Sequence, residues 1–85
     1  MSYHILYSPH AERDLKKLPT DAQIRIVTAL DSLMDNPEKH LKRLADIPLF
    51  SFRVGEFRVI LNIDEETSIL KILKIGKRNK IYDNL

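Results

Sequence analysis

The sequence has no cysteine, only two glycines and four prolines, and no long apolar run. Without cysteine there is no disulfide framework, no thiolate nucleophile and no cysteine-based zinc site. No apolar stretch approaches the roughly 18 residues that a membrane span needs. The first residues, Met1 to His4, lack the charged-then-apolar pattern of a secretion signal. We therefore expect a cytoplasmic protein with no membrane association.

What the sequence does contain fits one small globular domain. The 85 residues are 44% hydrophobic and 31% charged, which is ordinary for a folded soluble chain. A hydrophobic core needs most of such a length, so residues 1–85 are expected to form a single domain. The net charge is only +2, but Lys71 to Lys80 holds five bases and no acid. Such a stretch attracts polyanions, although a solvated strand end has the same composition.

The first 37 residues predict one short strand and two helices. Residues 3–7 are aromatic and β-branched enough for a strand. Ser8-Pro9 predicts a helix start, with Ser8 as the N-cap, and Pro19 ends that helix. Thr20 to Gln23 has the spacing of a capping box, and it opens a helix that stops at Asn36-Pro37. Helical spacing predicts the buried faces, namely Ala11, Leu15 and Leu18 on the first helix and Ile24, Val27, Leu30, Leu33 and Met34 on the second.

The second half of the chain predicts an antiparallel sheet. Residues 38–48 form a connection in which Leu41 and Leu44 could make a helical turn, and strands follow at 49–54, 57–63 and 68–75. Gly55-Glu56 fits a two-residue type II′ turn, which pairs Arg53 with Arg58. The expected fold is therefore α+β, a strand–helix–helix–three-stranded antiparallel meander with the helix pair packed on one face of the sheet.

Side-chain alternation divides this sheet into two unlike faces. One face is wholly apolar and is expected to pack under the helices, and the other is expected to be open and partly polar. The apolar face would carry Phe50, Phe52, Val54, Phe57, Val59, Leu61 and Ile63, and the other Leu49, Ser51, Arg53, Arg58, Ile60 and Asn62.

The opposed arginines of the open face pose the functional question. Like charges directly opposite each other cost about 0.2–1 kcal/mol, which is tolerated where the pair binds an anion. The alternative is that both arginines extend into water, or pair with Glu56 or a more distant acid. With a turn at Glu65-Glu66, Leu73 would lie opposite Arg58, and Arg78 would follow just past the strand end at Gly76.

These groups suit the cleavage of RNA by its own 2′-hydroxyl. Guanidinium groups bind phosphates and stabilise the charge of a developing phosphorane. A phenol such as that of Tyr82, four residues after Arg78, can exchange protons. His4, His10 and His40 fall in separate elements without metal-ligand spacing, and there is no glycine-rich phosphate loop. We expect neither a metal nor a cofactor.

Taken together, these motifs resemble the RelE branch of the RelE/ParE toxin superfamily. The resemblance is carried by the hairpin Phe52-Arg53-Val54-Gly55-Glu56-Phe57-Arg58-Val59-Ile60, by Lys74-Ile75-Gly76-Lys77-Arg78 and by Ile81-Tyr82. It covers almost the whole chain. It implies the toxin of a type II toxin–antitoxin module, a metal-independent endoribonuclease that cleaves mRNA in the ribosomal A site and inhibits translation.

The resemblance also implies roles for particular residues. Arg58 matches an arginine that contacts the scissile phosphate, Arg78 one that stabilises the transition state, and Tyr82 a tyrosine that stacks on a base or assists proton transfer. One departure is that Leu49 to Phe52 holds no lysine, so a general base from that strand is missing, and Lys42, Arg43 or Lys77 could compensate. RNA or ribosome binding would fall to Arg53, Lys42, Arg43, Lys71, Lys74, Lys77 and Lys80.

The implied partners are a cognate RelB-like antitoxin, the ribosome and mRNA, with operator DNA bound only through the antitoxin complex. An uncovered apolar sheet edge is expected to receive the antitoxin. Two other functions stay open. One is a ParE-like gyrase poison of the same fold without nuclease activity, and the other is a non-toxic nucleic-acid-binding module. Arg78 and Tyr82 favour the nuclease, whereas the missing lysines leave the binding module open.

Overall fold

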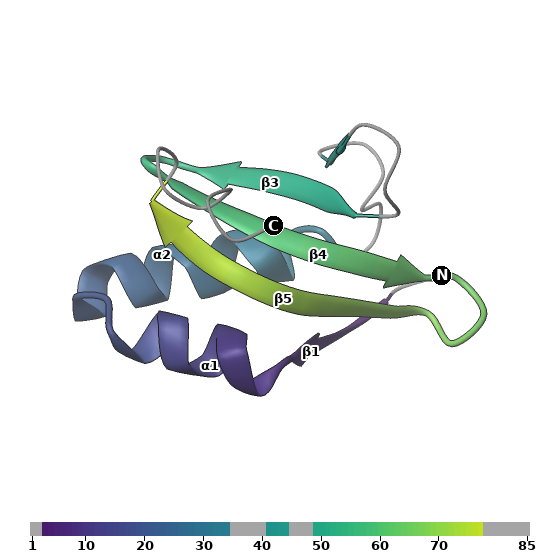
Figure 1. Cartoon of the computed structure of the whole chain (residues 1–85), viewed down its shortest axis with the longest axis horizontal. Coiled ribbons are helices and arrows are strands. Elements are labelled where there is room, and N and C mark those ends of the chain that lie inside the picture. The colour runs from purple at the N-terminus through teal and green to yellow at the C-terminus, as the bar shows by residue number, and fades with distance from the viewer. Residues whose placement is uncertain (1–2, 35–40, 45–48, 78–85) are drawn as a thin grey trace.

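The computed structural model of the chain describes residues 3–34, 41–44 and 49–77, and these contain two helices and five strands (Figure 1). No helix in this part of the chain is long and apolar enough to cross a membrane. In chain order the elements are β1 (His4–Tyr7), α1 (Pro9–Lys16), α2 (Thr20–Asp31), β2 (Lys42–Arg43), β3 (Phe50–Val54), β4 (Phe57–Asp64) and β5 (Ile69–Lys77).

The strands form one sheet in the order β1-β5-β4-β3-β2. β3, β4 and β5 make the predicted antiparallel meander, and β1 joins its far edge as a parallel neighbour of β5. Both helices lie on the same side of the sheet (Figure 1), so the predicted α+β architecture is confirmed. The pairing of Lys42 and Arg43 with β3 replaces the helical turn expected near Leu41 and Leu44, which is therefore wrong.

The hairpin of β3 and β4 has the predicted register. Arg53 pairs with Arg58, and Val54 pairs with Phe57. Gly55 adopts φ +58°, whereas Glu56 keeps a negative φ, as a type II′ turn requires. Local turn chemistry and strand alternation agree here, and together they fix which face each side chain occupies.

The register predicted for β4 and β5 is wrong. Arg58 lies opposite Gly76 rather than Leu73. One reason is the turn, which is longer than two residues, since Asp64 pairs with Ile69. The Asp64 carboxylate accepts hydrogen bonds from the backbone N–H groups of the two residues that follow Glu65, at 3.1 and 3.3 Å. Such Asx turns stabilise the non-helical backbone of a loop.

The second reason is a bulge in β5. Ile60 pairs with Lys74 and Leu61 with Ile72, so that Leu73 is the extra residue. The bulge shifts the alternation of side chains by one residue, and both Ile72 and Ile75 therefore reach the core. β5 also runs to Lys77, two residues beyond its predicted end.

The first helix forms as predicted. The Ser8 hydroxyl accepts a hydrogen bond from the Ala11 N–H at 3.1 Å, and Pro9 occupies the first turn. Ala11 is fully buried, and Leu15 and Leu18 pack against the core. The predicted apolar stripe of this helix is therefore confirmed.

The second helix differs from its prediction in three respects. Pro19 is the N-cap without a side-chain hydrogen bond, and the Gln23 amide donates to the Leu18 carbonyl at 2.8 Å, so there is no capping box. The helix ends at Asp31, before the expected stop. Ile24 is 62% exposed, and the buried residues are Ala22, Ile26 and Leu30 of the helix and Leu33 just beyond its end. The predicted face is therefore wrong at Ile24 and right at Leu30 and Leu33, and it omits Ala22 and Ile26.

Candidate nucleic-acid interface

The sheet face away from the helices gathers basic side chains from four strands. Paired residues of neighbouring strands place their side chains on the same face. One row across the sheet therefore holds Lys42, Ser51, Ile60 and Lys74, the next holds Arg53, Arg58 and Gly76, and a third pairs Asn62 with Lys71. We call this surface the basic face, after its five bases Lys42, Arg53, Arg58, Lys71 and Lys74.

The bulge in β5 helps to create this face. With simple alternation, Lys71 and Lys74 would lie on opposite sides of the sheet, since they are three residues apart. The extra residue Leu73 returns both lysines to the side of Arg58 and leaves Ile72 and Ile75 in the core. The same irregularity thus completes the core and concentrates the charge.

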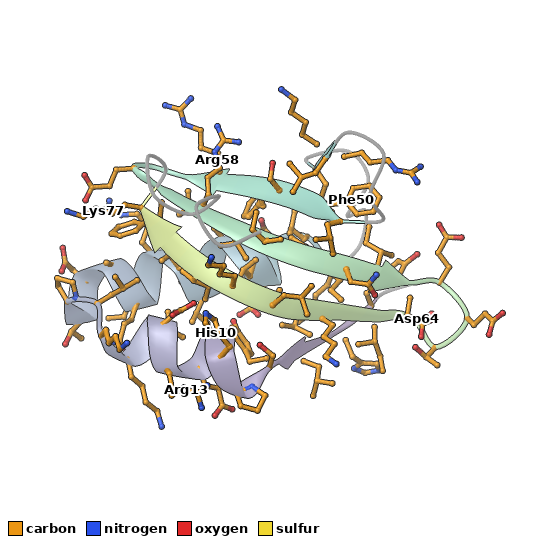
Figure 2. The ribbon with its side chains drawn as sticks, viewed as in Figure 1. His10, Arg13, Phe50, Arg58, Asp64 and Lys77 are labelled. Atoms are coloured by element: carbon orange, nitrogen blue, oxygen red, sulfur yellow. The ribbon has the colours of Figure 1, made fainter. Side chains whose placement is uncertain are left out.

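Two predicted RNA-binding residues do not share the basic face. Arg43 pairs with Phe50, and Lys77 pairs with Phe57. Both phenylalanines belong to the apolar face, and the Phe57 ring is buried in the core. Lys77 lies at the end of β5, close to the Arg58 end of the sheet (Figure 2). The remaining predicted site residues, Arg78, Lys80 and Tyr82, lie outside the described part of the chain.

The two opposed arginines have different environments. Arg53 is exposed, and its Nε donates to the Gly55 carbonyl at 3.4 Å. Arg58 is half-buried, and its Nη1 donates to the Ser51 hydroxyl at 3.4 Å. The two guanidinium groups are therefore directed to different acceptors, one at the turn and one over the centre of the sheet. This separation reduces the repulsion that a directly opposed pair would otherwise meet.

The centre of the basic face is closed rather than open. Ser51 and Ile60 are 2% and 1% exposed, so the prediction of an open second face is wrong at these positions. Ile60 lies on β4, the middle strand, with paired neighbours on both sides, and Arg58 contacts the hydroxyl of Ser51. Arg58 thus emerges from a packed surface, which limits the motion of its guanidinium group.

Charge is divided between the two ends of the β4–β5 hairpin. Arg58 and Lys77 lie at one end, and the acidic tip that begins at Asp64 lies at the other (Figure 2). Sequence reasoning missed one base at the positive end. Nη1 of Arg25, on α2, lies 3.6 Å from the position that a Cβ on Gly55 would occupy. Nothing in the helical pattern of α2 indicates that Arg25 reaches the turn between β3 and β4.

The histidines do not build a metal centre in this part of the molecule. His10 Nε2 lies 3.3 Å from Asp14 Oδ2, and the two residues are four apart on α1. His4 lies on β1, a separate element, as predicted. Within residues 3–34, 41–44 and 49–77, no three histidine, aspartate or glutamate side chains group closely enough to hold a metal ion.

The chain belongs to the ParE toxin family of type II toxin–antitoxin systems. The model of that family, described as "ParE toxin of type II toxin-antitoxin system, parDE", matches residues 5–82. Among curated proteins, the chain is 32% identical over 83 residues to Toxin RelE of Mycobacterium tuberculosis, covering 94% of this chain and 86% of that protein. It is 36% identical over 87 residues to Toxin RelG of the same organism, covering 96% and 98%.

Solved structures agree with these relatives. The RelBE2 toxin–antitoxin complex of M. tuberculosis matches with a TM-score of 0.82 and 31% identity, over 92% of this chain and 100% of that one. The archaeal RelE–RelB complex of Pyrococcus horikoshii matches with a TM-score of 0.78 and 26% identity, over 94% and 99%. The chain is therefore a type II toxin of the RelE/RelG kind, and the resemblance drawn from its sequence is confirmed.

Proposed function

We propose that this toxin is a ribosome-dependent endonuclease that cleaves mRNA in the A site. The observation that carries the proposal is the placement of Arg58, half-buried on the basic face with its guanidinium held on the Ser51 hydroxyl. A guanidinium that is fixed before the substrate arrives stabilises developing phosphate charge without paying for reorganisation. The surrounding lysines supply attraction for the phosphate backbone that does not depend on base sequence.

In the proposed reaction the 2′-oxygen of one nucleotide attacks the adjacent phosphorus. A bond from phosphorus to the 2′-oxygen forms, and the bond to the 5′-oxygen of the next nucleotide breaks. The 2′-hydroxyl gives up its proton to a base, and the departing 5′-oxygen takes up a proton. The products are a 2′,3′-cyclic phosphate and a 5′-hydroxyl.

Three residues have roles in the proposed reaction. Arg58 holds the scissile phosphate, since a guanidinium can bind two phosphate oxygens at once. Arg78 stabilises the charge of the transition state, and Tyr82 stacks on a base or assists proton transfer. The last two roles rest on the resemblance to RelE toxins.

Of the three bases that the sequence offers in place of the missing lysine, Lys42 is the one that shares the basic face with Arg58. β3 carries no lysine, and Arg43 and Lys77 pair with residues of the apolar face. Lys42 pairs with Ser51, whose hydroxyl contacts Arg58, so Lys42 shares the face of the proposed phosphate site. A lysine can act as a general base where its surroundings favour the neutral amine.

We also propose a RelB-like antitoxin as the partner that neutralises the toxin. Two of the similar structures, from M. tuberculosis and P. horikoshii, are toxin–antitoxin complexes. β1 is an edge strand of the sheet, and its Leu6 is 52% exposed. An exposed strand edge with an apolar side chain can receive an added segment of a partner.

The test is primer extension on mRNA in a programmed translation mixture, with and without ribosomes. The wild type is compared with Arg58→Ala and Arg78→Ala, and Lys16→Ala, an exposed position on α1, serves as the control for lost positive charge. We expect cuts at A-site codons only with ribosomes, present in the wild type and the control and absent from both arginine variants.

Other outcomes would point to a different function for the protein. No cuts and unimpaired translation would overturn the nuclease, and DNA-damage signalling on expression would then identify a gyrase poison. Cuts without ribosomes would mean a free ribonuclease. Failure of the protein to slow growth when expressed alone would favour a binding module.

A further inference from the structure

Ser8 and helix α1 bond the edge of β5 beyond the point where its pairing with β1 ends. β1 pairs with β5 only as far as Ile72. Beyond that point, the Ser8 N–H donates to the Ile72 carbonyl at 2.9 Å, and the Ser8 hydroxyl donates to the Leu73 carbonyl at 3.2 Å. The Ile75 N–H then donates to Asp14 Oδ2 at 3.0 Å. The N-cap Ser8 and Asp14 of α1 thus bond the edge of β5 that β1 leaves unpaired.

The aspartate is poorly suited to its own helix. Asp14 lies in the last turn of the eight-residue α1, where the negative end of the helix dipole disfavours a carboxylate. Aspartate is also a weak helix former. Its side chain is only 18% exposed. A local preference that is broken in this way indicates a tertiary role, and the hydrogen bond to Ile75 supplies one.

The bond lies next to the proposed phosphate site. Ile75 pairs with Val59, and the next residue, Gly76, pairs with Arg58. Any outward movement of β5 at Ile75 would displace Gly76 from Arg58.

We propose that Asp14 is a positioning residue whose carboxylate holds the end of β5 against α1 and so sets the strand that faces Arg58. This inference rests on the proposed function for its catalytic consequence, but the hydrogen bond itself can be tested without any activity. Asp14 does not touch the RNA. It acts through the backbone of Ile75, and its loss should lower the rate of cleavage more than the affinity for the ribosome.

The neighbouring histidine offers a competing explanation for Asp14. His10 Nε2 contacts the same oxygen, Oδ2, at 3.3 Å, and the His10 side chain is 56% exposed. A pair four residues apart on a helix, with one of its partners largely in water, contributes little. His10→Ala therefore separates the two explanations, because it removes the pair and keeps the bond to Ile75.

The first arm of the test is amide hydrogen exchange on the free toxin. In Asp14→Ala we expect the Ile75 amide to exchange about tenfold faster or more, because the end of β5 opens locally. Asp14→Asn keeps an oxygen acceptor and should retain most of the protection. His10→Ala and Glu12→Ala should leave the Ile75 amide unchanged, and Glu12→Ala is the matched control because it removes an exposed carboxylate from the same helix.

The second arm measures ribosome-dependent cleavage by the same variants, per folded protein. Asp14→Ala should lower the maximal rate of cleavage about tenfold, because the reacting groups are misplaced. The ribosome concentration that gives half the maximal rate should change little, because the binding surface is kept. Asp14→Asn should restore most of the rate. Should Asp14→Ala fail to fold, Asp14→Ser, whose side chain is too short for the bridge, replaces it in both arms.

The two arms separate the possible failures. An unchanged exchange rate of the Ile75 amide in Asp14→Ala would show that the Asp14 carboxylate does not hold the end of β5. Faster exchange with an unchanged maximal rate would overturn the positioning role. A wild type that cleaves no mRNA would overturn the proposed function and with it the positioning role. The hydrogen-exchange measurement would still decide whether the Asp14 carboxylate holds the end of β5.

Discussion

The two faces of the sheet show how one strand serves two purposes. On the side of the helices, Phe57, Val59 and Leu61 of β4 are at most 4% exposed and form the core. On the other side, Arg58 of the same strand lies among bases of three other strands. Burial of apolar area explains the first face. Opposed like charges oppose folding, so stability does not explain the second face, and its composition indicates a polyanionic ligand.

The largest effect is expected from the apolar face. Leu61→Ala should lower the free energy of unfolding by about 2–5 kcal/mol, because Leu61 is fully buried and the cavity cannot close completely. Chemical denaturation measures this change. Leu61→Met, which keeps the volume, should cost less than about 1.5 kcal/mol, and equal losses in both variants would show that packing at this position does not govern stability.

The next largest effect should come from the basic face and should appear in activity. Arg58→Ala should lower ribosome-dependent cleavage by about 10²-fold or more, the usual cost of removing one preorganised donor from a charged transition state. Its free energy of unfolding should change by no more than about 1 kcal/mol, since relief of the repulsion with Arg53 offsets the lost hydrogen bond to Ser51. Arg58→Lys should recover only part of the rate, because an ammonium cannot bind two oxygens in a plane. Full recovery would contradict this role.

A smaller effect is expected from the lysines that the bulge brings together. Lys71→Glu and Lys74→Glu should weaken association with programmed ribosomes and should each reduce the salt dependence of binding by about 1 in log–log slope. Filter binding over a range of salt concentrations measures both quantities. Lys16→Glu, which makes the same charge change on α1, should leave the slope unaltered, and an equal reduction there would point to net charge alone.

The smallest effect concerns Tyr7, at the end of β1. Its hydroxyl is buried and has no hydrogen-bond partner within the described residues. Burial, and then the charge of Asp31, raise the pKa of Tyr7 above its usual value of 10.0. Tyr7→Phe removes a buried polar group without a partner, and it should raise the free energy of unfolding by up to about 1 kcal/mol.

The raised pKa of Tyr7 predicts that the stability of the fold depends on pH. The unfolded chain releases the Tyr7 proton near its usual pKa, whereas the folded protein holds it to higher pH. This contribution to stability is therefore complete below pH 10 and is lost as the pH rises through the pKa of the folded state. Denaturation between pH 9 and about 11.5 should show a smaller decline in Tyr7→Phe than in the wild type. If stability declined with the same slope in both proteins, Tyr7 would be excluded as the source of the decline.

The β3–β4 hairpin could be predicted because two independent signals agree there. Gly55 fixes the turn, and alternation of apolar side chains requires the same register. The β4–β5 register could not be read in this way, since the turn after Asp64 gives no equally specific signal. The three-residue spacing of Ile72 and Ile75 was a sign of the bulge, and simple alternation overlooked it.

The candidate site was predictable only where it depends on the hairpin. The cross-strand placement of Arg53 and Arg58 followed from the turn. The partners of Asp14 and Arg25 could not be predicted, because each lies in a distant part of the chain; Asp14 and Ile75 are 61 residues apart. Contacts of this kind follow from the packing of α1 and α2 on the sheet rather than from any local pattern.

The most direct test of the division between the faces compares two neighbouring residues of β4. Arg58→Ala and Val59→Ala are measured side by side for free energy of unfolding and for ribosome-dependent cleavage per folded protein. We expect opposite results: Arg58→Ala loses cleavage and keeps its stability, whereas Val59→Ala loses stability and keeps its cleavage. Loss of both properties together in each variant would contradict this division.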